Sequence, residues 1–131
     1  MKKLHTALRA MGKQGLCDKY GDKWTPECPT TGRCHIVTQV IYRCCAPKGY
    51  YACCVTINGG THWYLRDKQG NVIDATRDQF DKPPTDKQYM EGRPVPACRR
   101  KGAEMTPCAK ELATKLGLKE KPRTKKKDKV S

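Results

Sequence analysis

Acidic residues are scarce in this chain of 131 residues. There are 13 Asp and Glu against 27 Lys and Arg, so the formal net charge is +14. The excess is concentrated towards the C-terminus, where residues 99–131 hold 12 basic and 4 acidic residues. A surface of this kind attracts polyanions without selecting among them. We therefore expect either nonspecific contact with nucleic acid through the basic tail, or a tail that is only solvated.

Long apolar runs are also lacking, and no stretch approaches the roughly 20 residues that cross a bilayer. The apolar residues of 1–12 are spaced as one helix face and do not form the core of a secretory leader. The 9 cysteines are an odd number, and the doublets Cys44-Cys45 and Cys53-Cys54 lie in apolar runs, where reduced cysteine packs as a small hydrophobic residue. We expect a cytoplasmic protein without membrane contact and with mostly reduced cysteines, the alternative being a fully disulfide-bonded chain.

The apolar periodicity predicts a single α+β domain over residues 1–118. An amphipathic helix is expected at 2–12, and a more apolar, central helix follows a cap at Thr30 or Thr31 and stops at 47–49. A last helix is expected after the Thr106-Pro107 cap signal, up to residue 116. Strands are predicted at Tyr50–Ile57, His62–Arg66 and Asn71–Thr76. Prolines make most of 81–97 irregular, and 119–131 is expected to be a disordered basic tail.

Cys34 is the cysteine best placed to act as a nucleophile. Only the thiolate is strongly nucleophilic, and the oriented backbone N–H groups at the start of a helix stabilise it. Cys34 falls in the first turn of the central helix, on the face of that helix directed at the sheet, whereas His35 is expected to point into solvent. Gly32 would let a substrate backbone approach closely. Cys44 and Cys45 lie at the opposite end of the helix, where its dipole disfavours a thiolate.

His62 and Asp74 are the expected partners of Cys34. If the turn at 67–70 pairs residues whose numbers sum to 138, His62 and Asp74 lie on one face of the sheet as diagonal neighbours. An odd sum would place them on opposite faces. The carboxylate is then expected to accept from Nδ1–H of His62, so that Nε2 faces the thiol, as in other nucleophile–base–acid triads. The third histidine, His5, lies on the basic N-terminal helix.

The order of these residues carries a resemblance to known proteins. A helix with the cysteine, a strand with the histidine and a strand with the aspartate resemble the transglutaminase-type core of the papain-like superfamily. Over residues 24–80 the chain more closely resembles the YunG-like family of small bacterial proteins. The matching positions are Trp24-Thr25-Pro26-Glu27, Pro29-Thr30, Gly32, Cys34, Asn58-Gly59-Gly60, His62, Gly70, Asp74 and Thr76-Arg77-Asp78-Gln79-Phe80. The N-terminal helix and residues 98–131 lie outside this resemblance.

The resemblance implies a papain-like fold, with the cysteine-bearing helix packed on an antiparallel sheet of three or more strands, and a Cys34–His62–Asp74 triad. Members of the family tend to have Gln where Arg33 stands and often Asn where Cys28 stands. Loss of that Gln removes a candidate oxyanion donor. Arg33 could replace it or select an acidic substrate. The candidates for the substrate pocket or the oxyanion site are Trp24, Arg33, Trp63 and Tyr64.

The leading hypothesis is a cofactor-free thiol hydrolase or acyl transferase that acts on an amide, ester or thioester of a protein or peptide-like substrate. The alternative is a non-catalytic basic protein that binds nucleic acid or a host or partner protein, and a chain of this composition would also suit a phage or mobile-element product. No metal is expected. The weaker option of a zinc site at Cys17, Cys28, Cys98 and Cys108 lacks any Cys-x-x-Cys pair.

Overall fold

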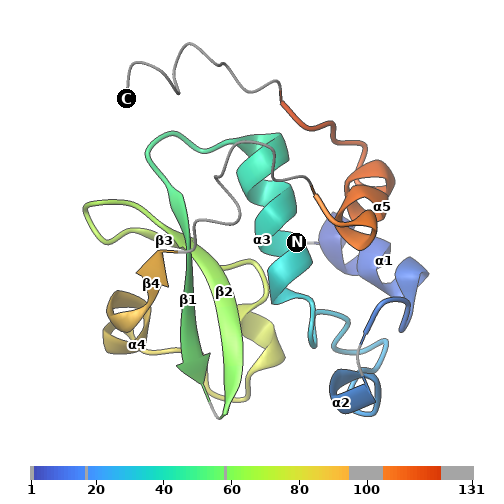
Figure 1. The fold of residues 1–131 in the computed structure, drawn as a ribbon. Helices are drawn as coiled ribbons and strands as arrows, with labels where there is room; N and C mark the ends of the chain where they lie inside the picture. Colours follow the sequence, from blue (N-terminus) through green and yellow to red (C-terminus); the bar gives the residue numbers. More distant parts are fainter. Residues whose placement is uncertain (1, 17, 58, 95–104, 122–131) are drawn as a thin grey trace.

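A computed structural model describes residues 2–16, 18–57, 59–94 and 105–121 (Figure 1). The chain is an α+β protein with one four-stranded antiparallel sheet. Its elements, in chain order, are α1 (Lys2–Met11), α2 (Asp18–Gly21), α3 (Cys34–Val40), η1 (Ile41–Cys45), β1 (Tyr51–Ile57), β2 (Gly60–Arg66), β3 (Val72–Ile73), η2 (Arg77–Gln79), α4 (Asp86–Glu91), β4 (Arg93–Pro94) and α5 (Pro107–Lys115).

The strands are ordered β3-β2-β1-β4 across the sheet. β1 and β2 form a hairpin, and the β2–β3 pairing joins Leu65 to Ile73 and Arg66 to Val72. Both of these pairs sum to 138, so the predicted register is confirmed. β3 is shorter than the expected strand at 71–76, because the chain turns away from the sheet after Ile73. It then forms η2, a 3-10 helix of three residues.

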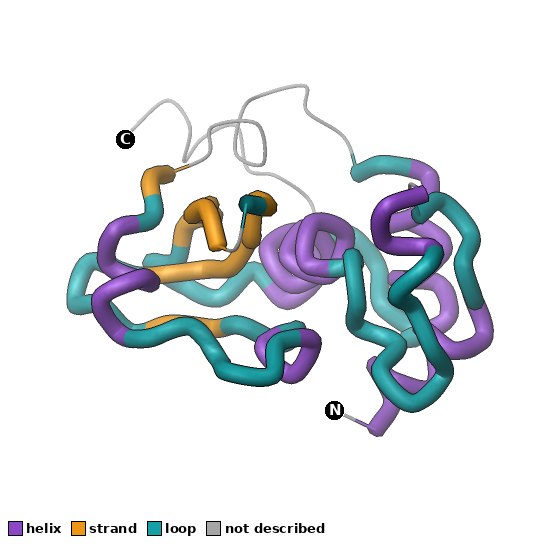
Figure 2. Tube along the Cα trace, turned by 90° about the horizontal axis from the view of Figure 1, so that it is seen from below, coloured by secondary structure: helices purple, strands orange, loops and turns teal. Residues whose placement is uncertain are grey.

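The central helix separates the sheet from the other long helices. α3 continues as the π-helical turn η1, and α1 and α5 lie on the side away from the sheet (Figures 1 and 2). Ala52 and Leu65 face this helix from the sheet and pack with Ile41 and Tyr42. The larger cluster joins α1, the central helix and α5 through the buried residues Ala7, Leu8, Met11, Ile36, Val37, Val40, Cys44, Met105, Ala109, Leu112 and Ala113.

The opposite face of the sheet is covered by α4. Tyr64 and Cys53 project there and pack against Tyr89 of α4. α4 was not predicted, because its six residues lie within the proline-rich stretch expected to be irregular. It begins with a capping box in which Thr85 and Gln88 each bind the other's backbone N–H. The short strand β4 was missed for the same reason, and β4 includes Pro94 itself.

The outer helices form as their sequences predict. α1 buries Ala7, Leu8 and Met11, and α5 begins with Thr106 accepting from the N–H of Ala109. The cap of α3 differs from the prediction. Arg33, not Thr30 or Thr31, holds the N-cap position, and its side chain does not cap the helix. None of the described helices is long and apolar enough to cross a membrane.

Part of the expected tail is attached to the domain. Arg43, buried in η1, donates to Glu120 at 2.5 Å, and its backbone carbonyl accepts from the N–H of Lys121 at 2.9 Å. The first residues of the stretch expected to be a disordered tail, 119–121, thus lie against the end of the central helix. The rest of the expected tail, 122–131, lies outside the described residues.

Because one face of α5 packs on the core, substitutions on its two faces should change the free energy of unfolding by different amounts. Leu112 is fully buried in the helical core, so Leu112→Ala should lower the free energy of unfolding by about 2–5 kcal/mol. Lys110→Ala, on the exposed face of the same helix, should change it by less than about 0.5 kcal/mol. Urea denaturation followed by circular dichroism measures both. Equal, small effects would show that α5 contributes little to the core.

Candidate active site

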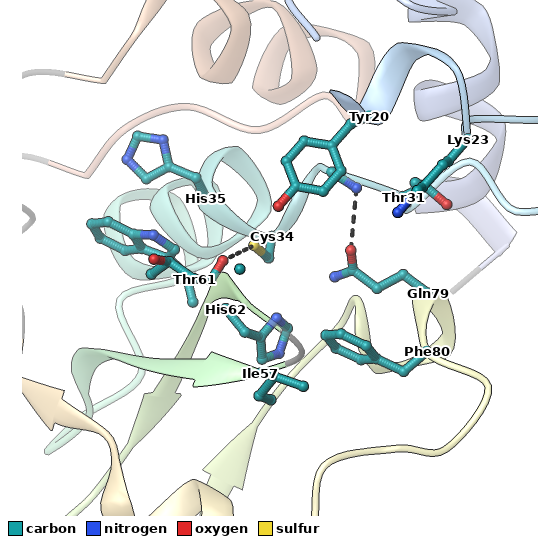
Figure 3. Close-up of a pocket in the computed structure, with 13 residues that line it drawn as sticks. Tyr20, Lys23, Thr31, Cys34, His35, Ile57, Thr61, His62, Gln79 and Phe80 are labelled. Carbon is teal, nitrogen blue, oxygen red and sulfur yellow. Dashed lines mark hydrogen bonds between the residues drawn. The ribbon is translucent and has the colours of Figure 1, made fainter. Parts of the chain in front are cut away.

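The first turn of α3 and the start of β2 bring Cys34 and His62 to one cavity. α3 begins at Cys34, as predicted, and the sulfur of Cys34 lies 3.8 Å from the carbonyl oxygen of Thr61. Both Cys34 and His62 line a cavity of about 280 Å³, and Figure 3 shows the imidazole beneath the sulfur. Cys34 is 9% exposed, and the cavity gives access to it.

His62 and Asp74 form a buried pair. Nε2 of His62 donates to Oδ2 of Asp74 at 2.6 Å, with the two side chains 2% and 3% exposed. The two side chains are close because the numbers of paired residues in β2 and β3 sum to 138. This register puts both side chains on the face of the sheet that also carries Tyr64. The ring of Phe80 lies edge-on to the imidazole, with centroids 4.8 Å apart. These contacts leave the imidazole little freedom to rotate.

The carboxylate of Asp74 is held by three further hydrogen bonds. The hydroxyl of Tyr89 donates to Oδ2 at 2.7 Å, and the backbone N–H and hydroxyl of Thr76 donate to Oδ1 at 3.2 and 3.4 Å. A buried carboxylate is costly unless its oxygens are hydrogen-bonded. Tyr89 and Thr76 therefore make an ionised Asp74 tolerable inside the protein. Tyr89 was not among the predicted site residues, because it lies on the helix that the sequence analysis missed.

The two imidazole nitrogens have the reverse of their predicted assignments. The sequence analysis expected Nδ1 to face Asp74, but Nε2 does so. Nδ1 is buried and has no hydrogen-bond partner within the described part of the chain. Since the ring is fixed through Nε2, Nδ1 is the nitrogen available to the sulfur of Cys34. The backbone path after Ile73 decides this assignment, because it sets the side from which Asp74 approaches the ring.

The surroundings of His62 favour its protonated, positively charged form. Burial would lower its pKa, but the hydrogen bond with Asp74 and the nearby acidic groups of Asp74 and Cys34 raise it to about 9. His62 is therefore an imidazolium at neutral pH.

Gln79 connects the cysteine loop to the acid. Its Oε1 accepts from the N–H of Gly32 at 3.1 Å, and its Nε2 donates to the hydroxyl of Thr76 at 3.0 Å. Gln79 lines the cavity, and its amide group lies between Tyr20 and Phe80 (Figure 3). The sequence analysis quoted Gln79 within the family resemblance without giving it a role. Its position near Cys34 depends on the η2 turn, which no periodicity signals.

Gly32 is required by chain geometry. Its φ is +71°, and a Cβ there would lie 2.7 Å from the Cβ of Tyr20. Any side chain would displace Tyr20, which lines the cavity together with Gly32. The predicted approach of a substrate backbone at Gly32 stays a prediction.

The other predicted pocket residues separate into two groups. Trp63 lines the cavity, whereas Trp24, Arg33 and Tyr64 are not among its lining residues. The guanidinium of Arg33 donates to the carbonyls of Gly12 and Gln14 at 2.6 and 2.8 Å, so it anchors the end of α1 and is not placed as an oxyanion donor.

Trp24 and Tyr64 are buried structural residues in this arrangement. The indole N–H of Trp24 donates to the carbonyl of Pro29 at 3.0 Å, within the loop that precedes α3. The hydroxyl of Tyr64 donates to the carbonyl of Tyr89 at 2.5 Å and so fastens α4 to the sheet.

The expectation that His35 points into solvent is wrong. Its ring is partly buried, packs 4.4 Å from the ring of Trp63 and borders the same cavity. The amide of Gln39 donates to its Nε2 at 2.9 Å. Burial lowers the pKa of His35, so it is neutral at pH 7. His35 belongs to α3 and Trp63 to β2, and the packing of the helix on the sheet brings their rings together, a contact that helix periodicity alone does not reveal.

The remaining cysteines are arranged differently from Cys34. No disulfide joins any two of the seven described cysteines, Cys28, Cys34, Cys44, Cys45, Cys53, Cys54 and Cys108. Burial raises the pKa of the Cys44 thiol. Of the four cysteines considered for zinc, Cys17 and Cys98 lie outside the described residues. Among the residues that are described, no three His, Cys, Asp or Glu side chains come together as metal ligands.

Fold and site define a small α+β protein in which a buried His–Asp pair adjoins a cavity thiol. A family model described as YunG protein matches residues 1–116, and the chain belongs to this family. The match includes α1 and α5, so the expectation that the resemblance ends at residue 80 and excludes the N-terminal helix is wrong. A search of curated proteins found no match, and a search of solved structures found none either.

The raised pKa of His62 can be tested by titration. Because the folded protein favours the imidazolium, its stabilising contribution is complete below pH 6.5, the ordinary value, and is lost as the pH rises through about 9. Carbon–proton NMR spectra of the three histidines should show His62 titrating near 9 and His35 below 6.5. Asp74→Asn should lower the His62 value, and His5→Gln assigns the third signal. An ordinary titration of His62 in the wild type would contradict the buried ion pair.

Proposed function

We propose that this protein is a thiol-dependent hydrolase or acyl transferase that acts on an amide, ester or thioester bond. The observation that carries the proposal is a cavity thiol beside a buried imidazole whose far nitrogen is fixed by Asp74 at 2.6 Å. A cysteine at a helix start, a histidine on a strand and an aspartate after the next strand also support a papain-like, transglutaminase-type core as the architecture.

In the first half-reaction the thiolate of Cys34 attacks the carbonyl carbon, an S–C bond forms and the carbonyl electron pair moves to oxygen. As the carbonyl re-forms, the bond to the leaving group breaks and Nδ1–H of His62 donates its proton to that group. The products are a thioester on Cys34, a released amine, alcohol or thiol, and a neutral His62.

In the second half-reaction a water molecule or another nucleophile attacks the thioester, and Nδ1 of His62 takes its proton. The S–C bond then breaks, the acyl product leaves, and the thiolate–imidazolium pair is restored. Water gives hydrolysis, and an amine, alcohol or thiol gives transfer. Asp74 accepts from Nε2–H throughout, which holds the ring and stabilises its positive charge.

Two N–H groups are suited to stabilise the oxyanion. The backbone N–H of Cys34 is in the first turn of α3, where N–H groups have no partner within the helix. Gln79 contributes the second, because an amide nitrogen carries two hydrogens and only one is used by Thr76. Gln79 thereby fills the role that was expected of Arg33, from a different part of the chain.

Selective alkylation tests whether Cys34 is activated. Cys45 is exposed and Cys34 is 9% exposed, so reactivity that follows exposure would label Cys45 first. A limiting dose of iodoacetamide near pH 6 should instead label Cys34 first, because the imidazolium of His62 keeps its sulfur as thiolate. Peptide mapping by mass spectrometry measures each site. His62→Ala should abolish the preference, and labelling led by Cys45 in the wild type would argue against an activated thiol.

Substitution of the acid tests whether the three residues act together. Asp74→Asn keeps the size of the side chain but not its charge, so the free energy of unfolding should fall by only about 1–2 kcal/mol. Turnover of a 4-nitrophenyl ester or a thioester should fall by about 10²-fold or more, since the imidazolium loses its counter-charge. Cys34→Ser should abolish turnover, whereas Cys53→Ser, in the middle of β1, should act only through stability. A folded Cys34→Ser protein with full biological activity would favour the binding-protein alternative.

A further inference from the structure

The permanent charge at the cavity rim is positive. Among the described residues that line the cavity there is no Asp or Glu, and Lys23 is the one Lys or Arg. The carboxylate of Asp74 lies behind the imidazole and is occupied by its four donors. The positive charge of His62 is balanced by Asp74 and by the Cys34 thiolate of the proposed mechanism, so Lys23 provides the positive charge that remains for a bound molecule.

Lys23 is free to bind a ligand. It is exposed, and within the described part of the chain its ammonium group forms no ion pair. It follows helix α2 and lies on the same wall as Tyr20, whose carbonyl accepts from its backbone N–H at 3.0 Å. In Figure 3 Lys23 and Tyr20 border the cavity on the side of the loop that precedes Cys34. An ammonium group at this position can bind the part of a substrate that extends beyond the scissile carbonyl.

The rest of the cavity wall is mostly aromatic. Phe80 and Tyr20 lie on one side, and the packed pair His35 and Trp63 lies on the other. A volume of about 280 Å³ has room for a group of roughly nine non-hydrogen atoms, at about 30 Å³ for each water-sized unit. Such walls favour a short hydrocarbon segment, and the absence of acids among them removes any preference for a cationic one.

We propose that the cavity accepts a short acyl group that carries a carboxylate, with Lys23 binding the carboxylate while Cys34 attacks the acyl carbon. This inference rests on the proposed thiol chemistry and adds its substrate class. The acyl group can come from two sources, an acidic residue in a peptide or a small dicarboxylic acid held as a thioester. The shared chemistry is an apolar spacer between a reactive carbonyl and an anion.

A pair of alkylating reagents tests the inference without any substrate. Iodoacetate and iodoacetamide are of similar size, and each forms an S–C bond with loss of iodide, but only iodoacetate is an anion. We divide the rate with iodoacetate by the rate with iodoacetamide. At low salt this ratio should be more than about threefold higher at Cys34 than at Cys45. Lys23→Met should lower this ratio, Lys23→Glu should lower it further, and added salt should reduce it in the wild type. Lys68→Met, which removes an exposed lysine in the turn between β2 and β3, is the matched control and should leave the ratio unchanged.

Two substrate pairs then distinguish the sources. N-acetyl-Glu and N-acetyl-Gln aminomethylcoumarin amides represent peptides, and glutaryl and pentanoyl thioesters represent small acyl donors. The anionic member should be turned over at least about threefold faster in one pair, and Lys23→Met should remove that advantage. An equal alkylation ratio at Cys34 and Cys45, or no reaction with the anionic member of either pair, would overturn the inference. A Cys34 that reacts with both alkylating reagents no faster than Cys45 would instead overturn the proposed function.

Discussion

The buried pair of His62 and Asp74 is the interaction on which the rest of the site depends. Removing two charges from water costs several kcal/mol for each, so the pair persists only where geometry and added hydrogen bonds offset that cost. Two elements provide those bonds. Tyr89 reaches Asp74 from α4, and Thr76 reaches it from the turn after β3. The short helix α4, which buries little apolar surface of its own, is thereby part of the support of the site.

Residues 74–80 join the sheet to the helical layer. Asp74 and Thr76 hold the imidazole, while Gln79 accepts from Gly32 just before Cys34. Asp78 accepts from the hydroxyl of Thr30 at 2.8 Å and lies 2.9 Å from Nε2 of His5 on α1. A single short segment thus sets the position of the thiol-bearing loop relative to the acid and the base. In this way Cys34, His62 and Gln79, which lie far apart in the sequence, come to line one cavity.

Much of this arrangement could be predicted from sequence, because strong periodic patterns and one register argument determine it. The outer helices, the β1–β2 hairpin and the shared face of His62 and Asp74 follow from local signals. The nitrogen that faces Asp74, the inward position of His35 and the buried guanidinium of Arg33 at the end of α1 do not. Each of these depends on a tertiary contact between segments with no recognisable local pattern. Thr85 and Gln88 have the spacing of a capping box, which indicates a helix start, but the surrounding prolines favoured an irregular stretch.

The charge of the cavity and the charge of the imidazole are consequences of the same arrangement. Asp74 raises the proton affinity of His62, so that the base carries a positive charge before a substrate binds. In the proposed mechanism that charge would act on the thiol, while Lys23 at the rim, with no described acid lining the cavity, would select an anionic substrate. A binding protein without chemistry would need the positive rim but not a thiol in the same cavity as an imidazole fixed by a carboxylate, and this placement is what favours the proposed enzyme.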